Sequence, residues 1–244
     1  MDESVLRTQS FTELKGLSVV IPCYKEDEKL VSQTYTELSF IGAEVIIVDD
    51  GDTMDFQDDF NVVRYVPQMG YGFAIKEGIK RASNSVICTM DGDGQHTVED
   101  VCKLYTVYKL RDDFKMIVGQ RWNLKEKWHR WAGRKVLNFL ASCISGHYLS
   151  DLNSGIRIFT RNEALGYSSI LCDTFSFTTS LTMSMVTDGH KMTYFPIDVK
   201  PRASGKSRVR VVKDGFVTLY YIIWVGIALR TRKIRKWMRS LLGR

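Results

Sequence analysis

Two carboxylates separated by one glycine, Asp91-Gly92-Asp93, end an apolar run and are followed closely by Gln95 and His96. Carboxylates two residues apart on a tight turn can face one hard cation, and the glycine keeps the space between them clear. Mg²⁺ or Mn²⁺ fits this pattern, because Mg²⁺ takes few protein ligands and completes its shell with water and phosphate oxygens. Asp91 and Asp93 are therefore candidate metal ligands, with Gln95 or His96 as a third.

Two other ligand-binding loops can be tested against the same residues. An EF-hand needs glycine at the sixth loop position and glutamate at the twelfth, and counting from Asp91 these positions hold His96 and Cys102. A dinucleotide fingerprint needs three spaced glycines after a first strand. The segment 70–75, GYGFAI, has Ile75 at the last of these positions. Neither pattern is satisfied, and no Walker motif is present.

An ordinary alternative for this acidic turn is a helix cap. Thr97 and Asp100 have the spacing of a capping box for a helix that follows. That box uses neither Asp91 nor Asp93, so the cap and the metal site can coexist.

Short apolar runs rich in β-branched residues predict five strands, at 17–22, 43–50, 61–66, 84–91 and 115–120. Helical patterns lie between them, at about 26–40, 70–82 and 98–111. This alternation predicts an α/β fold with a mainly parallel sheet and helices on both faces. Ligands of such sheets bind at the carboxyl ends of the strands. The polar residues that follow strand ends here are Tyr24, Glu26, Asp49, Asp50, Asp91, Asp93 and Arg121. Four strand ends meeting in one crevice favour a site over isolated turns.

Composition limits the class of protein. The chain has 244 residues, 44% hydrophobic and 25% charged, which fits one large domain or one domain with an appendage. Its five cysteines are spread out with no Cys-x-x-Cys pair, so we expect neither a disulfide framework nor a zinc ribbon, and a reducing compartment is favoured. The polar, acidic start of the chain is unlike a secretory signal peptide.

Charge is distributed unevenly. Residues 200–244 carry thirteen Lys or Arg and one acid, Asp214, whereas the other residues carry 21 bases and 27 acids. A basic end on an acidic body indicates an anionic partner at that end. Nucleic acid is disfavoured, because no nucleic-acid-binding module is recognisable.

The C-terminal residues indicate what that partner is. Residues 216–229 carry no charge but are shorter than the roughly 20 residues of a spanning helix. Residues 230–244 carry seven bases, with apolar residues on one helical face: Ile234, Trp237, Met238, Leu241 and Leu242. A basic amphipathic helix of this kind suits the membrane interface and anionic lipids. For 216–229, packing on the domain or on a second subunit is as well supported as insertion. We therefore predict a domain over 1–212 and C-terminal amphipathic, interfacial helices over 213–244.

Six segments, in order and suitably spaced, resemble family 2 glycosyltransferases with the GT-A fold, and among them the polyprenyl- or dolichyl-phosphate hexose synthases. The segments are VVIPCYKE, IIVDDGD, MDGDGQH, VGQRW, DLNSGIRIFTR and PRASGKSRVR, and the resemblance runs from about 17 to 212. It implies inverting transfer of a hexose from a nucleotide diphosphate sugar, of GDP-mannose or UDP-glucose type, to a polyprenyl or dolichyl phosphate. It also implies a Mg²⁺ or Mn²⁺ cofactor and a location at the cytoplasmic face of a membrane.

The resemblance carries roles to matching positions of this sequence. The nucleotide-binding positions it implies are Pro22, Tyr24, Glu26, Asp50, Asp91 and Gly92, and the metal ligands are Asp91, Asp93 and Gln95. Those implied for catalysis are Asp93, Arg121, Arg202 and Arg208, and those for the acceptor phosphate are Arg121, Arg134, Asn138 and Ser207.

Two positions depart from the pattern. Arg208 stands where a lysine usually closes the last loop, and Ser180 stands where many relatives have a glutamate. Transfer to a hydroxyl needs a general base, whereas a phosphate monoester is already ionised. The missing carboxylate therefore favours a phosphate acceptor, with Asp151 as the candidate base for the alternative, a transferase acting on a hydroxyl of a polysaccharide or glycolipid. A non-catalytic nucleotide-sugar-binding scaffold is disfavoured, because packing alone does not require the acidic turn and the arginine loops.

Overall fold

A computed structural model describes residues 13–111, 113–123, 127–202 and 211–241. Its strands are β1 (Leu17–Cys23), β2 (Glu44–Asp50), β3 (Val62–Tyr65), β4 (Val86–Thr89), β5 (Met116–Arg121), β6 (Arg157–Thr160) and β7 (Met192–Ile197). Its helices are α1 (Glu28–Phe40), α2 (Tyr71–Arg81), α3 (Val98–Leu110), α4 (Trp128–Ser145), α5 (Arg161–Gly166), α6 (Phe177–Asp188) and α7 (Val211–Leu241). The five predicted strands and three predicted helices are all present.

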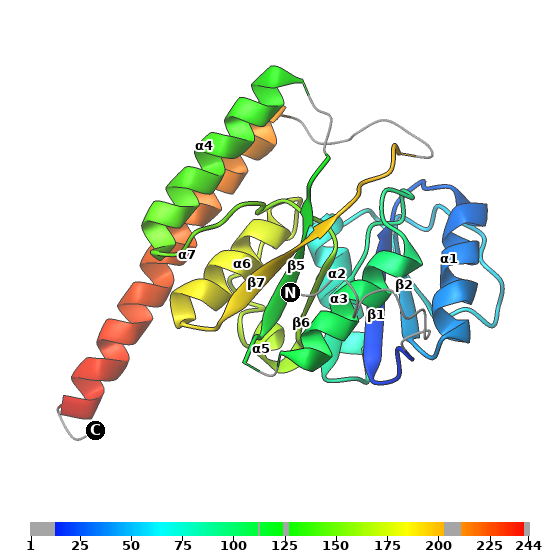
Figure 1. Cartoon of the computed structure of the whole chain (residues 1–244), viewed down its shortest axis with the longest axis horizontal. Helices are drawn as coiled ribbons and strands as arrows, with labels where there is room; N and C mark the ends of the chain where they lie inside the picture. The colour runs from blue at the N-terminus through cyan, green and yellow to red at the C-terminus, as the bar shows by residue number, and fades with distance from the viewer. Residues whose placement is uncertain (1–12, 112, 124–126, 203–210, 242–244) are drawn as a thin grey trace.

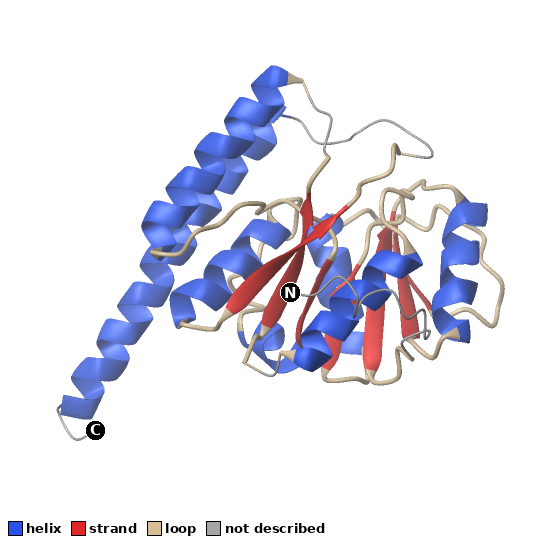
Figure 2. Cartoon of the chain, viewed as in Figure 1, coloured by secondary structure: helices blue, strands red, loops and turns tan. Residues whose placement is uncertain are grey.

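The strands form one twisted sheet in the order β3-β2-β1-β4-β6-β5-β7 (Figures 1 and 2). The neighbours β3, β2, β1 and β4 run parallel, as do β5 and β7, and only β6 is antiparallel to the strands beside it. All seven residues of β1 are buried, as expected for a central parallel strand covered on both faces. The predicted mainly parallel α/β sheet is confirmed.

Helices cover both faces of the sheet (Figure 2). One apolar cluster places α1 and α3 on one face, through residues such as Leu38 and Leu104. A second cluster places α2, α4, α5, α6 and α7 on the other face, through residues such as Ile75, Leu181 and Ile222. The predicted capping box of α3 is present, with Thr97 and Asp100 bonding to each other's backbone N–H.

The C-terminal helices predicted for 213–244 require a correction, because 211–241 form the single helix α7. No proline separates the uncharged residues 216–229 from the basic residues that follow. Gly226 lies within the helix, at the point where α4 comes close to α7. A Cβ on Gly226 would lie 2.5 Å from Cγ2 of Ile144. Among the described residues, no helix has the length and apolar character needed to cross a membrane.

Candidate active site

The site is built where strands of the same direction end together. β1, β2, β4 and β5 all run in one direction, so their carboxyl ends meet at one edge of the sheet. Asp50 ends β2, the turn with Asp91 and Asp93 follows β4, and Arg121 ends β5. The predicted gathering of polar side chains from several strand ends is therefore present.

Asp91 is held from two sides. Its Oδ1 accepts a hydrogen bond of 2.7 Å from the Tyr71 hydroxyl, at the start of α2. A Cβ on Gly155 would lie 2.1 Å from the Asp91 Oδ2 atom, so only glycine leaves room for the carboxylate there. Burial and the charge of Asp91 raise the pKa of Tyr71 far above its ordinary value, which keeps its hydroxyl a donor.

Asp93 is buried and forms an ion pair with Arg202. Its Oδ1 accepts from the backbone N–H of Gln95 at 3.0 Å, and its Oδ2 lies 2.8 Å from Nη2 of Arg202. Burial first, and then the nearby charge of Asp91, raise the pKa of Asp93, while Arg202 opposes them. Two carboxylates in this position favour a bound cation.

The donor set fits a divalent metal of the kind expected. The described residues contain no cluster of three or more His, Cys, Asp or Glu that could hold an ion alone. Two carboxylates suit an ion that takes its other ligands from water and a diphosphate. His96 is buried, burial lowers its pKa, and its Nδ1 has no hydrogen-bond partner in the described part of the chain. The side chain of Gln95 as a third ligand stays a prediction.

The two aspartates that end β2 accept hydrogen bonds from nearby backbone N–H groups. Both oxygens of Asp50 accept from backbone N–H groups, of Met69 at 2.6 Å and of Gly70 at 2.7 Å. Asp50 thus caps the entry to α2. Asp49 accepts from the backbone N–H and the hydroxyl of Thr53.

The other predicted nucleotide contacts lie around β1. Pro22 is buried within this strand, whereas Tyr24 and Glu26 are half-buried just after it. The Tyr24 ring packs on Gly51, where a Cβ would lie 2.9 Å from Cε2 of the ring. The structure therefore brings Tyr24, Asp50 and the Asp91 turn to one edge, and their contact with a nucleotide stays a prediction.

Arg121, a position predicted for the acceptor phosphate, forms an ion pair with the buried Asp151. Nε and Nη2 of Arg121 lie 2.8 Å and 2.7 Å from the two oxygens of Asp151, which is 2% exposed. Burial would raise the pKa of Asp151, but the charges of Arg121 and Arg134 outweigh it and lower the pKa. We call these three residues the arginine cluster. A carboxylate that is paired and stabilised as an anion is a poor general base.

Asn138 also lies inside, on α4 one turn after Arg134. Its amide nitrogen donates to the Ser150 carbonyl at 2.5 Å, and its Oδ1 has no hydrogen-bond partner among the described residues. The predicted Ser207 and Arg208 lie outside the described residues. Ser180 is fully buried and its hydroxyl accepts from the Cys172 N–H and donates to the Phe177 carbonyl. That position therefore belongs to the packing of α6, and its missing carboxylate carries less weight than expected.

Two residues that support the site did not emerge from the sequence. Arg157 is fully buried, and its Nη1 donates to the carbonyl of Thr178 and the hydroxyl of Thr182, both at 2.8 Å. Its Nη2 also donates to the Leu152 carbonyl. Burial lowers the pKa of Arg157 to about 10. Arg157 thereby ties the segment that contains Asp151 to α6. Arg157 is the last residue of the DLNSGIR segment, which is the sequence feature that could have pointed to it. No motif of the sequence points to Tyr71.

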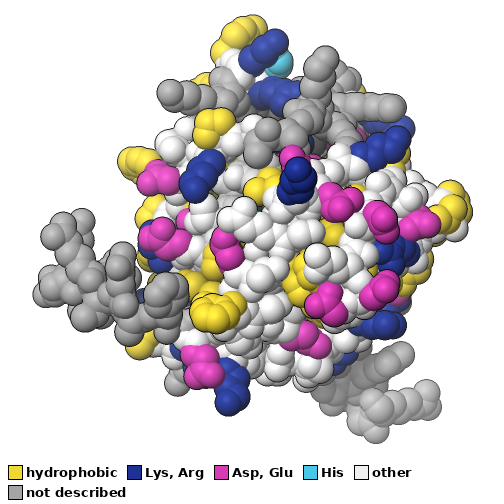
Figure 3. All heavy atoms as spheres, turned by 90° about the vertical axis from the view of Figure 1, so that its right-hand side faces the viewer, with side chains coloured by type: hydrophobic (Ala, Val, Ile, Leu, Met, Phe, Trp, Pro, Cys, Tyr) yellow, Lys and Arg dark blue, Asp and Glu magenta, His cyan; other side chains and the backbone are white. Residues whose placement is uncertain are grey.

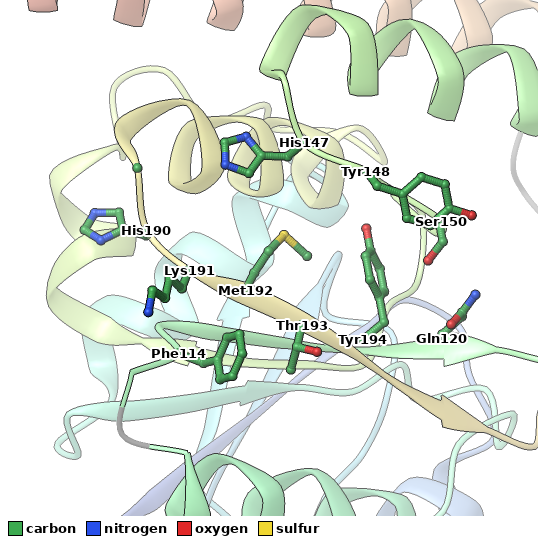
Figure 4. A pocket seen from close by; sticks show the side chains of 11 residues that line it. Phe114, Gln120, His147, Tyr148, Ser150, His190, Lys191, Met192, Thr193 and Tyr194 are labelled. Atoms are coloured by element: carbon green, nitrogen blue, oxygen red, sulfur yellow. The ribbon is translucent and has the colours of Figure 1, made fainter.

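A separate cavity of about 440 Å³ lies along the edge strand β7 (Figure 4). Met192 and Tyr194 point from β7 toward the segment that carries His147 and Tyr148. None of the predicted site residues lines this cavity. The predicted site residues lie at the strand ends, and Gln120 and Ser150 of this lining are the chain neighbours of Arg121 and Asp151.

Comparison with known proteins gives a consistent assignment. The family described as Glycosyl transferase family 2 matches residues 18–177. An uncharacterised protein of Methanocaldococcus jannaschii is 28% identical over 84% of this chain and 90% of its own length. An undecaprenyl-phosphate 4-deoxy-4-formamido-L-arabinose transferase of Salmonella typhimurium is 27% identical over 61% of this chain. The match spans half the length of that transferase.

Solved structures share the fold. Glucosyl-3-phosphoglycerate synthase of Mycobacterium tuberculosis, in complex with Mn²⁺, UDP-glucose and phosphoglyceric acid, superposes with a TM-score of 0.66. The two are 14% identical over 86% of this chain and 79% of the other. Such neighbours are GT-A glycosyltransferases, so the expected GT-A fold is confirmed.

Proposed function

The chain belongs to glycosyltransferase family 2, and on that premise we propose that it moves a hexose from a nucleotide diphosphate sugar to a polyprenyl or dolichyl phosphate. The donor is of the GDP-mannose or UDP-glucose type. The observation that carries the proposal is the arginine cluster beside the acidic turn. It contains two guanidinium groups and one carboxylate, Asp151, which is paired with Arg121, so its excess positive charge favours an anionic acceptor.

The relatives support the same acceptor class. Undecaprenyl-phosphate sugar transferases of Salmonella typhimurium and Proteus mirabilis match 61% and 68% of this chain. Both are named for a polyprenyl phosphate. A phosphate acceptor also explains why Asp151 can be held as an anion, since no base is needed for a nucleophile that is ionised at neutral pH.

The residues have two roles in the site at the strand ends. Asp91 and Asp93 would hold Mg²⁺ or Mn²⁺, and the bound ion would neutralise charge on the departing nucleoside diphosphate. Tyr71 keeps Asp91 oriented, because its hydroxyl donates to one oxygen of that carboxylate. Arg202, 2.8 Å from Asp93, is placed to donate to the diphosphate.

Arg121, Arg134 and Asn138 orient the acceptor phosphate. Ser207 and Arg208 belong to the same proposal through the segment PRASGKSRVR. In-line attack by a phosphate oxygen on the anomeric carbon breaks the bond to the diphosphate and inverts the configuration. The acceptor lies in a membrane, so the protein works at a membrane surface, on its cytoplasmic face.

The donor and the reaction can be tested together. Membranes carrying the protein are incubated with polyprenyl phosphate, Mn²⁺ and each of several labelled donors, including GDP-mannose and UDP-glucose. We expect label in the lipid fraction with one donor, and none with EDTA. Label in water-soluble or polysaccharide products, with none in the lipid fraction, would replace this function by transfer to a hydroxyl.

A further inference from the structure

The cavity beside β7 (Figure 4) has a lining of a different kind from the site at the strand ends. The aromatic residues Phe114, Tyr148 and Tyr194 line it. Most of the other lining side chains are neutral and can donate or accept hydrogen bonds: Gln120, His147, Ser150, His190 and Thr193. Its volume of about 440 Å³ lies within the range of small-molecule sites. The cavity therefore combines aromatic rings with uncharged polar groups.

The lining carries little net charge. Among the described residues that form it, Lys191 is the only one with a formal charge, and its Nζ lies 3.3 Å from Oδ2 of Asp113. The rings of His147 and His190 each have a hydrogen-bond partner within the chain. The open surface at the α1 end of the molecule differs, because Asp and Glu are spread among Lys and Arg there (Figure 3). A charged ligand is therefore poorly matched to this cavity.

Strand β7 adds backbone groups to the lining, because it is the last strand of the sheet. The carbonyls of Lys191 and Ile197 accept hydrogen bonds from residues that flank β5. Since the backbone groups of successive residues point to opposite edges of a strand, those of Met192, Tyr194 and Pro196 point away from β5. Proline has no N–H, so only two residues offer both a donor and an acceptor at this edge. That is too few for a peptide added as a further strand, but enough for a small ligand.

Two hydroxyl groups of the lining lack an acceptor. Ser150 and Tyr194 donate to no group in the part of the chain that the structure describes. The Tyr194 hydroxyl points from β7 toward the segment that carries Ser150 (Figure 4). Burial raises the pKa of Tyr194 to about 12, although Arg157 and the backbone N–H groups of Asp151 and Ser150 oppose it. The phenol therefore keeps its proton, and an unpaired buried donor favours a ligand with an acceptor oxygen.

We propose that the cavity beside β7 is a binding site for a neutral saccharide. Aromatic rings offer large apolar surfaces, on which the C–H faces of a sugar ring can pack. Each sugar hydroxyl both donates and accepts a hydrogen bond, which matches the amide, imidazole and hydroxyl groups of the lining. An entirely apolar ligand would leave those polar groups without partners.

The inference goes beyond the proposed function and does not rest on it. A saccharide in this cavity would be neither the donor nor the acceptor of the transfer, because none of the predicted site residues lines it. Its binding is measured with no nucleotide sugar, metal or polyprenyl phosphate present. A protein without transferase activity would therefore contradict the proposed function and leave the saccharide site standing.

Saturation-transfer NMR on the full chain detects such binding. The probes are methyl α-mannoside, methyl β-glucoside, methyl β-galactoside and N-acetylglucosamine, each at millimolar concentration with EDTA. We expect saturation transfer to at least one of them, and the same signal when GDP, UDP and Mn²⁺ replace EDTA. Transfer to none of them would overturn the inference. Loss of the signal with the nucleotides would overturn it too, because the sugar would then occupy the donor site.

Amide shifts of the protein locate the bound sugar. We expect shifts at the backbone amides of Met192 and Tyr194 and at the side-chain amide of Gln120, and none at Gly70 or Gly92 near the strand ends. The reverse pattern would assign the sugar to the site at the strand ends and would contradict the inference.

Substitutions test the lining itself. Tyr148→Ala removes a ring that is 82% exposed, so the fold should remain, and we expect at least about a tenfold loss of saccharide affinity. Tyr194→Phe keeps the ring and removes the hydroxyl, with an expected loss of about fivefold. Phe40→Ala is the control, because this aromatic ring is 91% exposed on α1. Unchanged affinity in both tyrosine variants, or an equal loss in Phe40→Ala, would overturn the inference, and thermal unfolding checks that each variant is folded.

Discussion

The acidic turn and the arginine cluster lie at the same edge of the sheet and carry an excess of opposite charge. At the turn, Asp91 and Asp93 are close together and Asp93 is buried, so its pKa is raised. In the cluster, Asp151 is buried too, yet its pKa is lowered by Arg121 and Arg134. The turn has spare negative charge and favours a cation, whereas the cluster has more arginines than acids and favours an anion. Their position at one edge suits the proposed transfer of a sugar from a metal-bound diphosphate donor to a phosphate acceptor.

The largest expected effect comes from removing the charge at the turn. Asp93→Asn should lower the rate of transfer by at least about 1000-fold, the equivalent of about 4 kcal/mol. The reason is that the proposed metal ion, which would bind the diphosphate, loses a ligand. The fold should remain, since replacing a buried carboxylate of raised pKa removes a desolvation cost. Transfer assays and thermal unfolding measure both, and turnover at the wild-type rate would exclude the metal assignment.

Next in size is the loss of one charge from the cluster. Arg134→Gln should raise KM for the lipid acceptor about 10- to 100-fold, the range expected for a hydrogen bond to a charged group. Donor binding should not change. The control is Lys135→Gln in detergent, which removes a neighbouring charge that is exposed on α4. Similar effects of both variants on KM would show that general charge, and not the cluster, attracts the acceptor.

A smaller effect concerns how Asp91 is oriented. Tyr71→Phe removes the 2.7 Å hydrogen bond to Asp91 but keeps the ring, which stacks on Phe175. We expect Mn²⁺ affinity to fall about tenfold, measured by calorimetry without donor or acceptor. Tyr65→Phe is the matched control, because it removes a similar bond to Glu77 elsewhere. Unchanged affinity in Tyr71→Phe would mean that the hydroxyl does not position the ligand.

The smallest expected effect is a difference between the two regions in how their contribution to stability depends on pH. Without metal, ionised Asp93 destabilises the fold, and this cost disappears as the pH falls through its raised pKa. Asp151 contributes stability above the ordinary pKa of an aspartate, which is lost as the pH falls through its lowered value. Asp93→Asn should therefore gain Tm over wild type mainly at neutral pH, and Asp151→Asn should lose Tm there and less near pH 3. Parallel pH profiles for the two variants would contradict the contrast.

The sequence predicted the acidic turn better than the cluster, for a physical reason. The strands before Asp50 and Asp91 are short apolar runs, and parallel topology brings their ends together. The pairing of Arg121 with Asp151 joins residues 30 apart across β5 and the segment before β6, and no periodicity encodes it. The sequence therefore offers Asp151 as a possible base, and the structure shows it paired with Arg121.

The second half of the chain was also harder to predict. β6 runs antiparallel between β4 and β5, which strict alternation of strands and helices does not anticipate. Helix α7 carries apolar residues on two faces, so the sequence left packing and membrane insertion equally supported for 216–229. The structure shows one face of α7 packed on the domain and the other exposed. Packing is therefore confirmed for the inner face, and contact with a membrane stays a prediction.

The most direct test of the account compares two acceptors of the same chain length, one with a terminal phosphate and one without it. Polyprenyl phosphate and the uncharged polyprenol of the same length are offered with the labelled donor and Mn²⁺, to wild-type protein and to Arg134→Gln. We predict transfer to the phosphate alone, and a higher acceptor KM in the variant. Transfer to the polyprenol at a comparable rate would show that the arginine cluster does not select a phosphate and would contradict the proposed function.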